Sequence, residues 1–111
     1  MEQDGTGTAA ASLAFDRARQ KAATYRALGN PRRLMILWAL SGRELSVGQI
    51  AETIGASLPS TSQHLRVLRR HAFVQSRREA QTVYYCARLD QSIPEIAAVG
   101  NPTLPAQGDA L

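Results

Sequence analysis

Apolar side chains recur three or four residues apart in four separate stretches of the chain. This is the spacing of one buried face of an α-helix. The stretches cover residues 13–28, 34–40, 47–54 and 58–68. The pattern therefore predicts four helices in the first two thirds of the chain.

Polar and glycine residues mark where these helices begin and end. Pro31 can open the second helix, because the first turn does not need its missing N–H. Ser46 and Gln49 have the spacing of a capping box at the start of the third. Gly55 can supply a left-handed stop, and Ser57 can cap the fourth helix. A short helix, a tight turn and a second helix in series predict a helix-turn-helix.

The periodicity changes after residue 72. Residues 73–78 and 81–85 are rich in β-formers and predict two strands, joined through Glu79 and Ala80 as a β-hairpin. A helix-turn-helix followed by a hairpin is a winged helix. The expected fold class is therefore mainly α with a small β-hairpin (α+β), a winged helix-turn-helix.

The two ends of the chain have weaker patterns. Residues 1–10 lack periodicity and predict a disordered N-terminal tail, and residues 100–111 predict a flexible C-terminal tail. A last short helix is expected within residues 90–99, where Ile93, Ile96 and Val99 form an apolar stripe. We thus expect one winged helix-turn-helix domain over residues 11–99.

The distribution of charge along the chain suggests which kind of partner this fold binds. All 13 basic residues of the 111-residue chain lie within residues 17–88, where three acidic residues leave a net charge of +10. Twelve of the 13 are arginine, whose planar fork suits phosphate and guanine. A basic centre favours a polyanion partner, although a solvated basic surface has the same composition.

Four segments of the sequence resemble the ArsR family of bacterial winged-helix repressors, over roughly residues 25–90. They are Ala27–Leu34, Glu44–Ala51, Ser62–Leu68 and Val83–Tyr85. The resemblance implies a homodimer whose first and last helices form the interface. It also implies that the second helix of the helix-turn-helix reads the DNA major groove.

Metal-sensing members of that family differ from this sequence at their metal sites. Many carry cysteines where this chain has Ser46 and Gly48, and a serine hydroxyl is a poor ligand for soft metals. The last expected helix contains no histidine, which the zinc-binding pattern of other members requires. We therefore expect no metal and no cofactor, and the effector is unknown.

Two alanines also depart from the family pattern. Ala72 and Ala80 take positions where relatives often have glycine. Because positive φ is costly for alanine, the wing turn is expected to be wider than in typical relatives.

The candidate DNA-binding residues lie on the fourth helix and the wing. Leu58, Thr61, Leu65 and Leu68 share the spacing of a packing face, with a thymine contact as the alternative for Leu58. Gln63 suits adenine, hydroxyl groups suit bases or phosphates, and arginines suit phosphates. The full set of candidate DNA-binding residues is Ser57, Ser60, Thr61, Ser62, Gln63, His64, Arg66, Arg69, Arg70, Arg77, Arg78 and Gln81. Arg32 and Arg33 are further candidates for phosphate.

The expected function is a dimeric, sequence-specific transcriptional repressor that binds double-stranded DNA at an inverted-repeat operator. Two alternatives stay open. One is a winged-helix protein-interaction module; the other is a thiol-sensing repressor that uses Cys86, although a lone cysteine is also a common core residue.

The sequence carries no catalytic triad, phosphate-cradling loop or paired-carboxylate motif, so no enzyme is expected. With neither a signal peptide nor a membrane span in view, the protein is expected in the cytoplasm.

Overall fold

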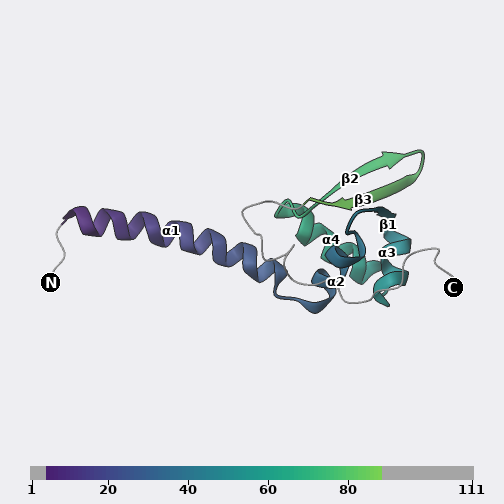
Figure 1. The fold of residues 1–111 in the computed structure, drawn as a ribbon, viewed down its shortest axis with the longest axis horizontal. Helices are drawn as coiled ribbons and strands as arrows, with labels where there is room; N and C mark the ends of the chain where they lie inside the picture. The colour runs from purple at the N-terminus through teal and green to yellow at the C-terminus, as the bar shows by residue number, and fades with distance from the viewer. Residues whose placement is uncertain (1–4, 89–111) are drawn as a thin grey trace.

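The computed structural model describes residues 5–88 and contains four helices and a three-stranded sheet (Figure 1). The short helix expected within residues 90–99 and the C-terminal tail lie outside the described residues. The elements in chain order are α1 (Gly5–Leu28), α2 (Pro31–Ala39), β1 (Glu44–Ser46), α3 (Val47–Ile54), α4 (Leu58–Arg70), β2 (Val74–Glu79) and β3 (Thr82–Ala87). The winged helix-turn-helix fold is confirmed.

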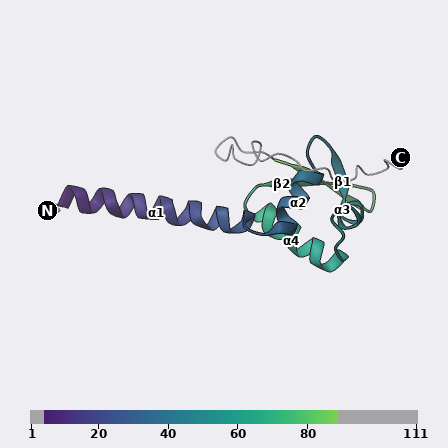
Figure 2. The same cartoon turned by 60° about the horizontal axis from the view of Figure 1, so that its bottom comes forward.

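Helix α1 projects from the rest of the described chain as a long arm (Figures 1 and 2). It begins at Gly5, whereas an irregular tail is predicted up to residue 10. The three consecutive alanines at residues 9–11 extend the helix, because alanine has the highest helix propensity. Only the last turn of α1, with Ala27 and Leu28, is buried among the described side chains.

The predicted helix caps are confirmed. The Ser46 side chain accepts a hydrogen bond from the Gln49 N–H, and the Gln49 side chain accepts one from the Ser46 N–H, at 3.2 and 2.9 Å. Gly55 ends α3 with a left-handed φ of 68°. The Ser57 hydroxyl accepts from the Ser60 N–H at the start of α4. These local contacts fix the angle at which α4 follows α3.

The core lies between α2, α3, α4 and the sheet. Its most deeply buried large apolar side chains, each less than 2% exposed, are Ile36, Leu40, Ile50, Leu65, Leu68 and Phe73. They come from three helices and the segment before β2, so the helix-turn-helix and the wing share one core. None of the helices between residues 5 and 88 combines the length and apolar content that a membrane span requires.

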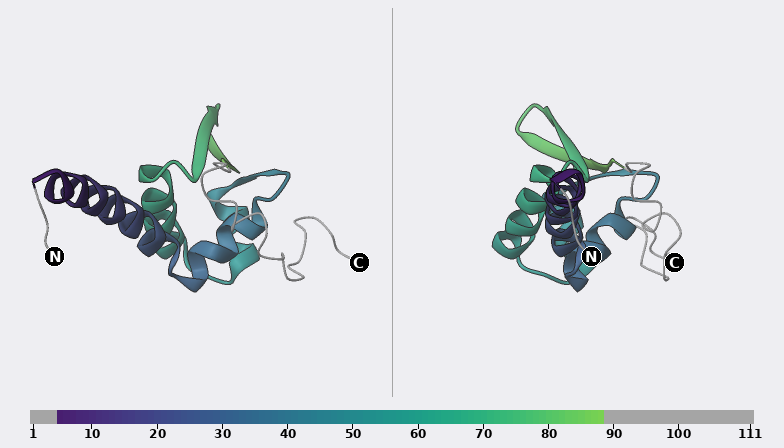
Figure 3. Two further views of the ribbon diagram at one scale, coloured as in Figure 1. Left: turned by 60° about the vertical axis from the view of Figure 1, so that its left-hand side comes forward. Right: turned by 90° about the vertical axis from the view of Figure 1, so that its left-hand side faces the viewer.

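The sheet has the strand order β1-β3-β2, and both pairings are antiparallel. Strand β1 is missing from the sequence prediction, because three residues carry no alternation and form a strand only by pairing with β3. Strands β2 and β3 form the predicted wing, which extends away from the helices (Figure 3).

The prediction of a wide wing turn is wrong. Glu79 pairs with Thr82, so Ala80 and Gln81 alone connect the strands. Ala80 accepts a positive φ of 56°, and Ala72 accepts one of 64° before β2. The pairing of β2 with β3 along six residues of each strand holds Ala80 in this conformation despite its cost.

Ala80→Gly should stabilise the protein. Relief of the left-handed alanine, a gain of about 1–2 kcal/mol, exceeds the backbone entropy that glycine loses, about 0.5–1 kcal/mol. A net gain of about 0.5–1 kcal/mol is expected from urea denaturation. Gln81→Gly is the matched control, because Gln81 in the same turn does not have positive φ. Equal gains from both variants would contradict the strain at Ala80.

Candidate nucleic-acid interface

Helix α4 has one buried face and one polar, basic face. Thr61, Leu65 and Leu68 are at most 1% exposed and anchor the helix on the core. The opposite face contains no acidic residue, because α4 as a whole has none. Its exposed polar side chains are Ser62, Gln63, Arg66, Arg69 and Arg70. The predicted division of α4 into a packing face and a basic face is thus present.

The structure decides two residues at the start of α4 for which the sequence left both packing and DNA contact open. Thr61 is a candidate for DNA contact, but its side chain is fully buried, and its hydroxyl has no hydrogen-bond partner within the described chain. It belongs to the packing stripe, four positions from Leu65 and seven from Leu68. Leu58, which has the spacing of that stripe, is 54% exposed. The stripe therefore begins one turn later than the spacing predicts.

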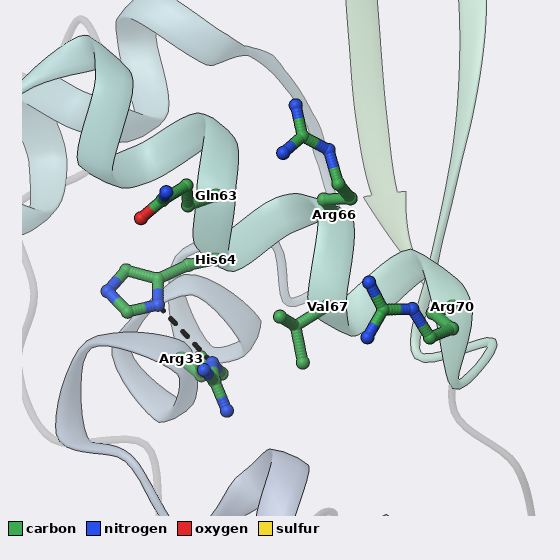
Figure 4. A pocket seen from close by; sticks show the side chains of 6 residues that line it. All are labelled: Arg33, Gln63, His64, Arg66, Val67 and Arg70. Carbon is green, nitrogen blue, oxygen red and sulfur yellow. Dashed lines mark hydrogen bonds between the residues drawn. The ribbon is translucent and has the colours of Figure 1, made fainter.

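A shallow pocket of about 220 Å³ opens between α4 and the start of α2 (Figure 4). Gln63, Arg66 and Arg70 reach it from α4, and Arg33 reaches it from α2. His64 and Val67 complete the lining, which contains no carboxylate. Three of the six lining residues are arginine, so the pocket suits an anionic group such as phosphate.

Arg33 and His64 form the polar contact between these helices. The Arg33 Nε–H donates to Nδ1 of His64 at 3.3 Å, and Nη1 donates to the carbonyl oxygen of Ala27 at 3.1 Å. Because Nδ1 accepts, neutral His64 carries its hydrogen on Nε2. The sequence alone suggests only phosphate contact for Arg33, since nothing local links residues 31 positions apart.

The surroundings of His64 favour its neutral form. Partial burial lowers the pKa of His64 below its ordinary value of 6.5, and the positive charges of Arg33 and Arg32 lower it further. Arg32 itself donates to the carbonyl oxygen of Gly55 at 3.2 Å. The two arginines at the start of α2 thus tie that helix to the helix-turn-helix.

The wing carries an ion-pair cluster centred on Arg77. Its Nε and Nη2 donate to the two carboxylate oxygens of Glu44, both at 2.8 Å, and Nη1 donates to Glu79 at 2.8 Å. The guanidinium lies 4.8 Å from the centre of the Tyr84 ring. Arg77 therefore reaches from β2 across β3 to β1 and clamps the three strands.

This clamp changes the role expected for Arg77. Two carboxylates already engage its guanidinium, which weakens its attraction for phosphate. Its hydrogen bonds are also the main cause that lowers the pKa of Glu44. Arg78 and Gln81 remain exposed on the wing.

Cys86 lies within the sheet and is half-buried. Its neighbours in the sheet register are Glu44 on β1 and Gln75 on β2. The Gln75 side-chain NH₂ donates to the sulfur at 3.4 Å. Cys86 is therefore neither a core residue nor a freely exposed thiol.

The positions where metal-sensing relatives carry cysteines form the start of helix α3 in this chain. Ser46 closes the capping box of α3, and Gly48 lies in the first turn of that helix. Within residues 5–88, no three His, Cys, Asp or Glu side chains lie together as a metal site would require.

The fold and the basic face of α4 are those of a winged helix-turn-helix protein. A family described as a helix-turn-helix domain matches residues 28–77. The HTH-type transcriptional regulator YgaV of Escherichia coli K12 is 36% identical over 89 residues, which cover 79% of this chain and 90% of that protein. This chain spans only 47–62% of the length of three other curated relatives.

Solved structures agree with this class. NolR from Sinorhizobium fredii has a TM-score of 0.74 at 32% identity, over 89% of this chain and 92% of that one. The homodimeric DNA-binding domain of Mb0332 from Mycobacterium bovis, described as a possible ArsR-family regulator, has a TM-score of 0.67 at 31% identity, over 89% and 86%. The chain belongs to the ArsR family of winged helix-turn-helix regulators.

Glu44→Gln should reduce the amount by which the free energy of unfolding falls at acidic pH. The pKa of Glu44 is lower in the folded chain than in the unfolded one. Its contribution is therefore complete above about pH 4.5 and is lost as the pH falls through the folded value. Urea denaturation at pH 3 and pH 7 should show a smaller difference for Glu44→Gln than for the wild type. Asp16→Asn, on α1 and remote from the wing, is the control; an equal effect there would exclude the clamp as the cause.

His64→Gln should remove a decline in stability at mildly acidic pH. The pKa of His64 is lower in the folded chain than in the unfolded one. As the pH falls below about 6.5, the unfolded chain therefore binds the proton first and the fold loses stability. Denaturation midpoints between pH 5 and pH 8 should change less in His64→Gln. His71→Gln removes the other histidine and leaves the Arg33 contact intact; this variant should keep the wild-type profile.

Proposed function

We propose that this protein is a dimeric, sequence-specific DNA-binding transcriptional repressor. The observation that carries the proposal is the exposed face of α4, which is basic and free of carboxylates while its other face is fixed in the core. A rigid helix with this division can enter a major groove and present its polar side chains to the bases.

The DNA-reading residues in this proposal are Ser60, Ser62, Gln63 and His64. Neutral His64 offers its Nε2–H as a donor, and Gln63 offers an amide that pairs with adenine. Ser57 caps α4 with its hydroxyl oxygen and keeps a hydroxyl hydrogen for phosphate. The phosphate-binding residues are Arg66, Arg69, Arg70, Arg78 and Gln81, with Arg77 holding the wing.

The dimer in this proposal uses α1. Leu13, Phe15 and Tyr25 are 46–66% exposed on this arm, which has few contacts with its own core. Exposed apolar side chains of this size fit association with a second copy. The Mb0332 domain, similar to this chain along most of its length, is homodimeric. The domain that does this work is proposed to span residues 11–99.

Two-fold symmetry of such a dimer requires an inverted-repeat operator, with half-sites about 10 base pairs apart or a multiple of that. Selection from a random double-stranded DNA library tests this directly. Enrichment of a palindrome supports the repressor. If no sequence is enriched, the fold is acting as a protein-interaction module instead.

Gln63→Ala should relax the base preference at one position of each half-site. The lost discrimination is expected to be about 1–3 kcal/mol, measured by competition between the selected operator and its single-base variants. Arg78→Ala is the comparison variant, because a phosphate contact carries no sequence information. It should weaken all sequences alike and lower the slope of log K against log salt by about 1. Uniform weakening by Gln63→Ala would contradict a base-reading role.

A further inference from the structure

Leu58 is an exposed leucine on an otherwise polar recognition surface. The exposed large apolar side chains of the described residues are Leu13, Phe15, Tyr25 and Leu58. The first three lie on α1 and belong to the proposed dimer surface. Leu58 lies at the first position of α4. It is the one such side chain on α4.

The core beneath the first turn of α4 has no place for Leu58. Ala56, two residues earlier, packs against the core cluster, and Thr61 closes the core from the next turn. Ser57 caps the helix between them. Leu58 is thus directed away from the interior, although its spacing from Leu65 and Leu68 is that of the buried stripe.

The surroundings of Leu58 fit DNA. Its exposed neighbour one turn along α4 is Ser62, and Arg66 follows a further turn along the same flank. No carboxylate lies on the helix. The flank of α4 that begins at Leu58 therefore carries no negative charge of the helix and suits a polyanion.

The first residues of a recognition helix lie against base edges in the major groove. The apolar group that a base pair offers there is the C5-methyl group of thymine. A leucine against a donor or acceptor of a base edge would displace water and return no hydrogen bond, which costs free energy.

We propose that Leu58 contacts the C5-methyl group of a thymine in each half-site and selects a T·A pair at that position. The inference rests on the proposed DNA-binding function. Leu58 is then a specificity-determining residue that acts by apolar contact, beside the hydrogen-bonding residues of the same helix.

Replacement of thymine by uracil tests this contact, because uracil lacks only the methyl group. Each thymine of the selected operator is replaced in turn, and the dissociation constant of the wild-type dimer is measured. At one thymine per half-site, the replacement should weaken binding about fourfold to fifteenfold, the value of one or two buried methylene groups.

Leu58→Ala should abolish this discrimination. The variant should bind the thymine and uracil operators equally, and as weakly as the wild type binds the uracil one. Because the side chain is exposed, the variant should fold normally, which thermal denaturation checks. Gln63→Ala is the matched control on the same helix; it should weaken binding yet keep the thymine preference at the Leu58 position.

Three results would overturn the proposal. The first is a uracil scan without effect at any position, and the second is an undiminished thymine preference in Leu58→Ala. The third is loss of the dimer in Leu58→Ala on gel filtration, which would assign the residue to a protein contact. If the wild type selects no DNA at all, the proposed function itself fails. That outcome differs from the first result above, in which an operator is selected but no uracil replacement changes the dissociation constant.

Discussion

The burial of one face of α4 is the constraint on which the remaining structure depends. Leu65 and Leu68 are almost fully enclosed by residues of α2, α3 and the segment before β2. Rotation of the helix about its axis would expose them and bury arginines, at a cost of several kcal/mol. The orientation of the basic face is therefore a consequence of core packing, and the polar side chains need no other support to point outward.

Two polar contacts then join the neighbouring elements to this helix and to each other. Arg33 connects α2 to His64 and fixes which imidazole nitrogen is free to donate. Arg77 connects β2 to Glu44 on β1 and so joins the wing to the strand that leads into α3. In both cases an arginine of the basic surface supports another part of the interface. Basic composition alone thus overstates the number of arginines available to DNA.

Most of the fold and part of the interface follow from the sequence. The helices, their caps, the stop at Gly55 and the two strands of the hairpin were predicted from residues at most four positions apart, so their signals are local. Gln63, Arg66 and Arg70 could be assigned to the outer face by their helical spacing alone. The spacing also placed Thr61 on the packing face, but it could not show that Leu58 is exposed, because the same spacing continues past the point where the core ends. The depth of the core beneath the first turn of α4 decided which of the two is buried.

The sequence by itself determined the class of fold, the family and the basic character of the recognition helix. The tertiary structure decided β1, the tight wing turn at Ala80, the pairing of Arg33 with His64 and the clamp at Arg77. The physical reason is distance along the chain. These two arginines meet partners 31 and 33 residues away, and β1 exists only through its pairing with β3. Such contacts form when the shared core brings separate segments together, and no local pattern of residues records them.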